Sequence, residues 1–86
     1  MRIEYSKSAV KALQRIDKHQ RLAIRDAIQG LTLIPPKGDI KPLQGYKDGR
    51  MRLRVGSYRV IYRYGNDGQM IVLYIIEIGS RGDIYK

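Results

Sequence analysis

The chain has 86 residues, of which 17 are Lys or Arg and 8 are Asp or Glu, so its formal net charge is +9. This length predicts one domain spanning residues 1–86, with a small core, because a chain of this size buries only about 60–65% of its unfolded surface. Solubility alone requires a charge of magnitude about 2–8, so the excess indicates a polyanionic partner: nucleic acid first, an acidic protein second, a membrane surface third.

The composition also argues against several classes of protein. Cysteine is absent, which excludes disulfides and thiolate metal sites and fits a reducing cytoplasm. Glu4 stands where the apolar part of a signal peptide would begin, and the longest apolar run, residues 70–76, is too short for a membrane span of about 20 residues. No group of His, Asp and Glu has metal-ligand spacing. We therefore expect a cytoplasmic protein without a membrane partner, metal or cofactor.

The first half of the chain predicts a strand and two helices. Residues 2–5 alternate charged and apolar side chains, as a short strand does. Ser6 or Ser8 can cap a helix. The apolar residues of this helix recur at spacings of three and four: Ala9, Val10, Leu13 and Ile16. A break at residues 17–19 precedes a second helix that ends near Leu31, and such a short connection implies an antiparallel helical hairpin.

An irregular connection and a series of strands are predicted for the second half. Prolines at positions 35, 36 and 42, with a glycine at 38, interrupt regular structure until Gly49. Charged and apolar residues then alternate with a period of two over residues 50–55, which is the pattern of a half-buried strand. A tight turn at Gly56 and Ser57 leads to a return strand over residues 58–64.

The last part of the chain predicts a further hairpin. A turn at residues 66–68 precedes a strand over residues 70–78, which is apolar on both faces, as is typical of a strand inside a sheet. A break at residues 79–80 precedes a short segment that ends at Tyr85. The whole order predicts an α+β fold, in which an N-terminal strand and a helical hairpin pack on a mainly antiparallel sheet of four or five strands.

The expected hairpin register gathers the arginines on one face. If Gly56 and Ser57 form a two-residue turn, Val55 pairs with Tyr58 and the ladder runs on to Arg50 opposite Arg63, and directly opposed residues share a face. One face then carries the apolar residues Met51, Leu53, Val55, Tyr58, Val60 and Tyr62. The other carries Ile61 and five arginines: Arg50, Arg52, Arg54, Arg59 and Arg63.

This arginine array has two interpretations, a solvated sheet face or a phosphate-binding surface. Five like charges on two strands repel one another, and no acid lies between Arg50 and Arg63 to neutralise them. Arginine at every position suits bidentate contact with phosphates. The array therefore favours phosphate binding. Two roles remain open for Glu77, an ion-pair partner or a base. Two also remain open for Tyr85: it either stacks on a base or donates a proton, or it anchors the end of the sheet.

Three blocks of the sequence together resemble the RelE/ParE toxin superfamily. They are Leu-Gln-Gly at residues 43–45, Gly-Arg-Met-Arg-Leu-Arg-Val-Gly-Ser-Tyr-Arg-Val-Ile-Tyr at residues 49–62, and Ile-Gly-Ser-Arg-Gly-Asp-Ile-Tyr at residues 78–85. The similarity covers nearly the whole chain and implies a RelE-like toxin of a bacterial type II toxin–antitoxin system, neutralised by a cognate antitoxin. RelE-type members of the superfamily cleave mRNA in the ribosomal A site, whereas ParE-type members poison DNA gyrase.

The resemblance also implies roles for individual residues. The matching positions that surround the scissile phosphate are Arg59, Arg81, Tyr85 and, on the preceding strand, Arg52. The remaining arginines of the array are expected to bind the RNA backbone: Arg50, Arg54 and Arg63. The best-known RelE-type members have lysines at the strand positions, and many relatives have a histidine where this chain has Ser80. Arginine stays protonated at neutral pH, so an evident acid–base pair is missing.

The activity that follows from the resemblance is a metal-independent endoribonuclease acting on mRNA bound to the ribosome, with contacts to 16S rRNA. The RNA 2′-hydroxyl would attack the adjacent phosphate and leave a 2′,3′-cyclic phosphate, while Arg59 and Arg81 stabilise the developing charge. Two alternatives remain. A gyrase inhibitor would need a protein-binding surface, and a simple RNA-binding module would show salt-sensitive binding without cleavage.

Overall fold

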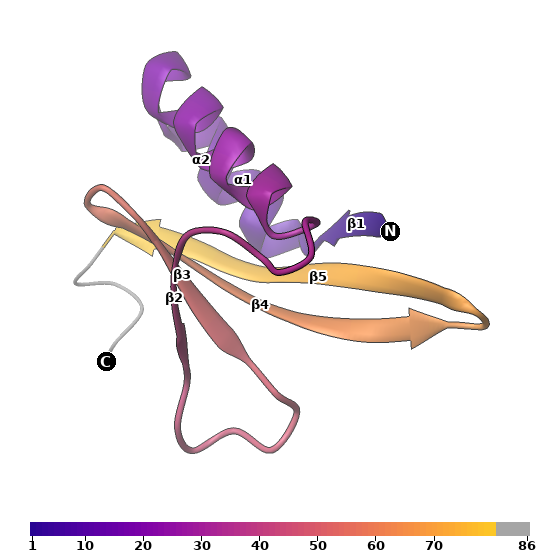
Figure 1. Ribbon diagram of the computed structural model, residues 1–86. Coiled ribbons are helices and arrows are strands. Elements are labelled where there is room, and N and C mark those ends of the chain that lie inside the picture. Colours follow the sequence, from indigo (N-terminus) through magenta and orange to yellow (C-terminus); the bar gives the residue numbers. More distant parts are fainter. Residues whose placement is uncertain (81–86) are drawn as a thin grey trace.

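Two helices cover one face of a five-stranded sheet in the computed structural model, which describes residues 1–80 (Figure 1). The sheet has the strand order β1-β5-β4-β3-β2, with β1 parallel to β5 and all other neighbours antiparallel. The predicted α+β class and mainly antiparallel sheet are therefore confirmed. In chain order the elements are β1 (Arg2–Tyr5), α1 (Lys7–Arg15), α2 (Lys18–Gly30), β2 (Asp39–Pro42), β3 (Met51–Val55), β4 (Tyr58–Asp67) and β5 (Met70–Ser80).

Helix α1 begins at one of the two predicted caps, Ser6. The Ser6 hydroxyl accepts a hydrogen bond from the amide of Ala9 at 3.0 Å and donates one to the carbonyl of Ile76 in β5 at 2.6 Å. A single residue thus starts the helix and ties it to the sheet. The second helix begins at Lys18 directly after its N-cap Asp17, so the predicted break at residues 17–19 is wrong at its last two positions.

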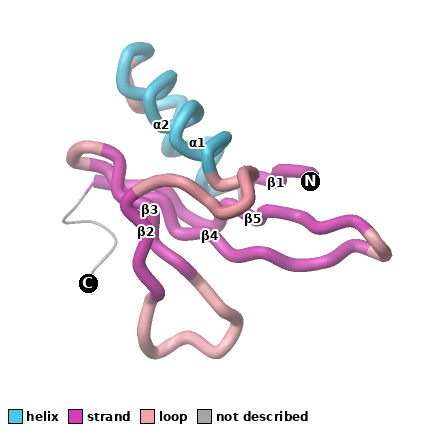
Figure 2. The backbone as a smooth tube through the Cα atoms, in the orientation of Figure 1, coloured by secondary structure: helices cyan, strands magenta, loops and turns pink. Residues whose placement is uncertain are grey.

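Three predicted boundaries in the sheet are also wrong. Residues 39–42 were expected to be irregular but form β2, which pairs with β3; proline at 42 is tolerated because β2 is an edge strand. The second hairpin turn is at residues 68–69, not 66–68. The predicted break at residues 79–80 is absent, since Gly79 pairs with Arg59 and Ser80 with Tyr58. Figure 2 shows the long β4–β5 hairpin and the loop of residues 43–50 that joins β2 to β3.

We call the helix-covered side of the sheet the inner face and the opposite side the outer face. The core on the inner face combines apolar residues of both helices with alternate residues of the strands. The buried members from the strands are Leu53, Val60, Tyr62, Leu73, Ile75 and Ile78. Tyr64 lies beside them and donates its hydroxyl hydrogen to the carbonyl of Leu31, at the end of α2, at 2.7 Å.

A β-bulge in β5 decides which residues reach each face. Ile61 pairs with Glu77 and Tyr62 pairs with Ile75, so Ile76 is the extra residue of the bulge. Because of this extra residue, Ile75 and Ile78 both join the core although they are three positions apart. Strict alternation would place them on opposite faces.

Candidate nucleic-acid interface

The register of the β3–β4 hairpin is the one expected from the sequence. Val55 lies opposite Tyr58, and the ladder continues without a shift to Met51 opposite Tyr62. The turn has Gly56 at φ 60°, which suits a hairpin turn with glycine at its first central position. The outer face of these two strands therefore carries Arg52, Arg54, Arg59, Ile61 and Arg63, with Arg50 one residue before β3. The predicted convergence of the arginines is confirmed.

Two of these arginines are buried, which a merely solvated face would not require. Arg52 is 7% exposed and Arg59 is 8% exposed. The buried Ile61 lies opposite Arg52 and two residues after Arg59 on β4. Arg52 donates from Nη2 to Oδ1 of Asp39 on β2 at 3.2 Å, and its buried Nε has no hydrogen-bond partner within residues 1–80. Removing a guanidinium from water is costly unless it is fully paired. The outer face therefore holds charge at the expense of stability.

Arg50 is held at the end of the β2–β3 loop by two contacts. Its Nε donates to Oδ2 of Asp48 at 3.0 Å, and its guanidinium carbon lies 4.5 Å from the centre of the Tyr46 ring. The hydrogen bond from Arg50 lowers the pKa of the Asp48 carboxyl, so Asp48 is ionised at neutral pH. The amide of Leu43 donates to the carbonyl of Arg50 at 3.0 Å, which closes the loop. The Arg50 side chain is thus oriented before any ligand arrives.

A third arrangement fixes Arg63. Its guanidinium carbon lies 4.6 Å from the centre of the Tyr74 ring, and Tyr74 is its cross-strand partner on β5. Space for this pair comes from Gly65, where an added Cβ would lie 2.8 Å from Cε2 of Tyr74 and 3.0 Å from Nη1 of Arg63. A larger residue at position 65 would push the pair apart.

The outer face keeps an excess of positive charge despite these partners. Asp39 pairs with Arg52 and Asp48 pairs with Arg50. Arg54 is exposed and lies between Asp39 on β2 and Arg59 on β4. Guanidinium groups are permanent donors without acceptor sites, so they suit phosphate oxygens and supply no general base. Electrostatic binding of a phosphate backbone is therefore what this surface can do chemically.

Within residues 1–80 no three His, Asp or Glu side chains lie together as metal ligands would. No helix of this part of the chain is long and apolar enough to cross a membrane.

The fold is shared with small toxins of known structure. The chain is similar to the "YoeB/ParE toxin from Agrobacterium tumefaciens", with 24% identity and a TM-score of 0.79 over 94% of this chain and 99% of that one. It is also similar to RelE in the RelB–RelE antitoxin–toxin complex from Methanococcus jannaschii, with 30% identity and a TM-score of 0.68 over 94% of this chain and 93% of that one. A third similar structure is the archaeal RelE–RelB complex from Pyrococcus horikoshii. Its matching chain has 32% identity to this one and a TM-score of 0.65, over 95% of this chain and 96% of that one.

A family model assigns the sequence itself. The model "ParE toxin of type II toxin-antitoxin system, parDE" matches residues 3–85. No curated protein matches the sequence. The chain belongs to this family of type II toxin–antitoxin toxins, and the resemblance to the RelE/ParE superfamily is confirmed.

The structure brings together most, not all, of the residues chosen from the sequence. Those on the outer face or next to it are Arg50, Arg52, Arg54, Arg59 and Arg63. Arg81 and Tyr85 lie outside the described residues. Sequence reasoning missed Asp39, Asp48 and Tyr74, because two of them precede the arginine segment and the third depends on pairing between β4 and β5. The pairing of Asp39 with Arg52 could have been found if residues 39–42 had been read as a strand.

Proposed function

We propose that this toxin is a metal-independent endoribonuclease that cleaves mRNA in the ribosomal A site. The observation that supports the proposal most is the pair of buried arginines, Arg52 and Arg59, on the outer face of the sheet. A protein-binding surface gains little from buried guanidinium groups, because removing these charges from water is costly. A phosphate placed there gains strong charge-assisted hydrogen bonds in a partly water-excluded setting.

In the proposed reaction, the RNA 2′-hydroxyl loses its proton to water and attacks the adjacent phosphorus, and the 5′-oxygen of the next nucleotide leaves and takes up a proton, which gives a 2′,3′-cyclic phosphate. Arg59 and Arg81 stabilise the charge that develops on the phosphate oxygens, and Tyr85 stacks on the substrate or donates a proton to the leaving oxygen. Arg52, oriented by Asp39, contributes a further positive charge. Arg50, Arg54 and Arg63 bind the neighbouring backbone, and contacts to 16S rRNA place the toxin on the ribosome.

A cognate antitoxin is the proposed partner that silences this activity. The relatives from M. jannaschii and P. horikoshii were solved as complexes with RelB. The net charge of +9 and the arginine-rich outer face favour an acidic partner segment that competes with RNA for the same guanidinium groups.

The test is primer extension on translated mRNA with the wild type, Arg59→Ala and Arg81→Ala. We expect A-site cuts from the wild type and a loss of about 100-fold or more in each variant, the effect of removing one preorganised charge contact. Arg25→Ala, an exposed arginine on α2, is the matched control and should cut like the wild type.

The second candidate function is inhibition of DNA gyrase, which is favoured by the match to the ParE family model. Intact mRNA together with gyrase-trapped DNA breaks would establish it and exclude the nuclease. If the protein binds RNA with an affinity that falls steeply as the salt concentration rises, and cuts no RNA, it is an RNA-binding module.

A further inference from the structure

The two edge strands of the sheet, β2 and β1, are protected against pairing to different degrees. β2 carries Lys41 and Pro42, and lysine and proline on an edge strand discourage another strand from joining it. β1 contains neither residue type, and its sequence, Arg-Ile-Glu-Tyr, alternates charged side chains with apolar or aromatic ones. The free side of β1 can therefore accept a further strand.

A backbone hydrogen bond shows which groups of β1 face its free side. The amide of Ser6 donates to the carbonyl of Ile75 on β5 at 2.9 Å. The N–H and C=O groups of successive residues alternate between the two sides of a strand, so the even-numbered residues of β1 bond to β5 and the odd-numbered residues point away from it. The amide and carbonyl of Ile3 thus lie at the centre of the free side, where no strand of residues 1–80 pairs with them.

This geometry restricts how a second copy of β1 could pair antiparallel with the first. Odd-numbered residues must face odd-numbered residues for their N–H and C=O groups to meet. With Ile3 opposite the Ile3 of the second copy, Arg2 of each copy lies opposite Glu4 of the other. A shift of two residues in either direction sets Arg2 opposite Arg2 or Glu4 opposite Glu4. Directly opposed charges attract when unlike and repel when alike, so the register centred on Ile3 is selected.

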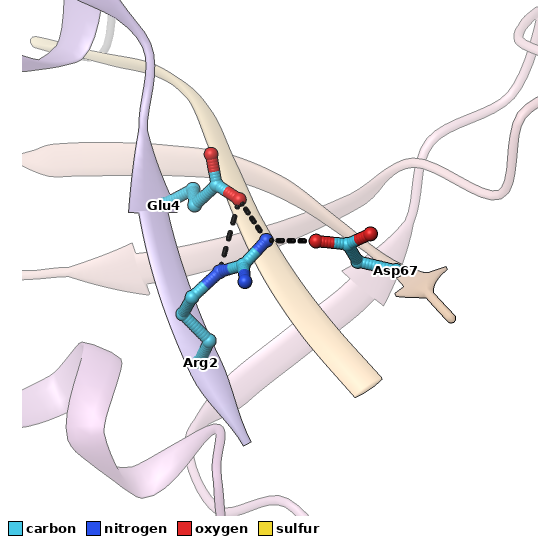
Figure 3. Close-up of polar contacts among 3 residues, drawn as sticks. All are labelled: Arg2, Glu4 and Asp67. Carbon is cyan, nitrogen blue, oxygen red and sulfur yellow. Dashed lines mark hydrogen bonds and ion pairs between the residues drawn. The ribbon is translucent and has the colours of Figure 1, made fainter. Parts of the chain in front are cut away.

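Arg2 and Glu4 keep atoms free for these contacts although they already pair within one copy (Figure 3). Arg2 donates from Nε and Nη2 to Oε2 of Glu4 at 3.1 and 2.6 Å, and from Nη2 to Oδ2 of Asp67 at 2.8 Å. Nη1 of Arg2 and Oε1 of Glu4 make no hydrogen bond within residues 1–80. In the selected register Arg2 and Glu4 form non-hydrogen-bonded pairs, whose Cα atoms are about 4.5 Å apart, so these two atoms can meet.

The inner face of this edge is apolar. Ile3 and Tyr5 are half-buried against the core, and Met1 is exposed. With Ile3 opposite Ile3, Met1 lies opposite Tyr5, so each copy covers apolar surface of the other.

Charge repulsion between the two copies is weak at this edge, although the net charge of each is +9. One cation, Arg2, lies there beside two acids, Glu4 and Asp67. The two copies of β4, which carry Arg59 and Arg63, would be five strand spacings apart, about 24 Å. This separation exceeds the Debye length of about 8 Å at physiological ionic strength, so repulsion between the arginine arrays is screened.

We propose that two copies of this chain associate through β1, in an antiparallel pair centred on Ile3, so that their sheets join into one. The two-fold pair keeps Arg2 and Glu4 of both copies on the same face, and the two outer faces therefore lie side by side. The dimer presents two arginine arrays on one surface. The inference does not depend on the proposed nuclease activity.

The test is sedimentation velocity of the full chain at about 10 to 500 µM, because so small an interface binds weakly. We expect a monomer–dimer equilibrium in the wild type. Glu4→Arg and Arg2→Glu each set like charges opposite one another and should weaken dimerisation about tenfold or more. Glu77→Arg makes the same change of charge on β5, away from the paired strand, and should dimerise like the wild type.

An equimolar mixture of Glu4→Arg and Arg2→Glu separates pairing between copies from pairing within one. Both variants lack the Arg2–Glu4 pair within a copy, but a mixed dimer sets two arginines opposite two glutamates, so the mixture should associate. In the wild type, hydrogen exchange of the Ile3 amide should slow as the protein concentration rises, whereas exchange of the Glu4 amide, which points towards β5, should not change. A wild type that stays monomeric, single variants that dimerise as the wild type does, or a mixture that stays monomeric would overturn the proposal.

Discussion

The two faces of the β3–β4 hairpin are built from alternate residues of the same strands and have opposite energetics. On the inner face Leu53, Val60 and Tyr62 are buried against the helices and contribute the apolar burial that stabilises the fold. On the outer face Arg52 and Arg59 are nearly as buried but carry charge. Burial on one side of a sheet is therefore no evidence of a stabilising role. The inner face stabilises the fold, and the outer face holds the charge on which the proposed RNA binding depends.

The largest expected effect is on the inner face. Leu53→Ala should lower the free energy of unfolding by about 3 kcal/mol, because it removes a fully buried side chain and leaves a cavity. Arg54→Ala, the next residue on the opposite face, is exposed and should change it by less than about 0.5 kcal/mol. Urea denaturation measures both variants, and similar losses at the two positions would contradict the division between the faces.

A smaller effect of opposite sign is expected on the outer face. Arg52→Met keeps the volume and removes a buried charge whose partner Asp39 is half exposed and can be hydrated again. We expect the free energy of unfolding to rise by about 1 kcal/mol while RNA binding weakens. Thermal denaturation and a salt-dependent RNA binding assay would show the two changes. A large loss of stability in this variant would show that Arg52 supports the fold.

The smallest effect concerns a titration on the inner face. Burial, together with the neighbouring Tyr64, raises the pKa of Tyr62 from 10.0 to about 12. A raised pKa means that the folded chain holds the proton more tightly, so this contribution is complete below pH 10 and is lost as the pH rises from about 10 to 12. Tyr62→Phe should therefore unfold at a higher pH than the wild type, as circular dichroism across that range would show. If the pH midpoint of alkaline unfolding is the same in both proteins, ionisation of Tyr62 does not determine that midpoint.

Whether the sequence could predict a feature of these faces depended on how far apart along the chain the interacting residues lie. The alternation over residues 50–55 and the Gly56–Ser57 turn are local, so the register and the arginine array followed from them. Residues 39–42 contain a proline and form a strand only because β3 offers them an edge. The Arg63–Tyr74 pair and the bulge depend on how β5 meets β4, and neither strand reveals that by itself. The roles of Arg59, Arg81 and Tyr85 rest on the family resemblance.

The bulge at Ile76 acts as a phase shift in the pattern of β5. Before it, even-numbered positions such as Val72 and Tyr74 belong to the outer face, and after it the odd-numbered Glu77 and Gly79 do. Deletion of Ile76 would remove the bulge and restore a single phase, while Ile75 and Ile78 stay on the inner face and Glu77 on the outer face. If every residue of β5 were paired without a bulge, the same sequence would turn one half of the strand over, so the extra residue keeps both halves of β5 in phase with the core.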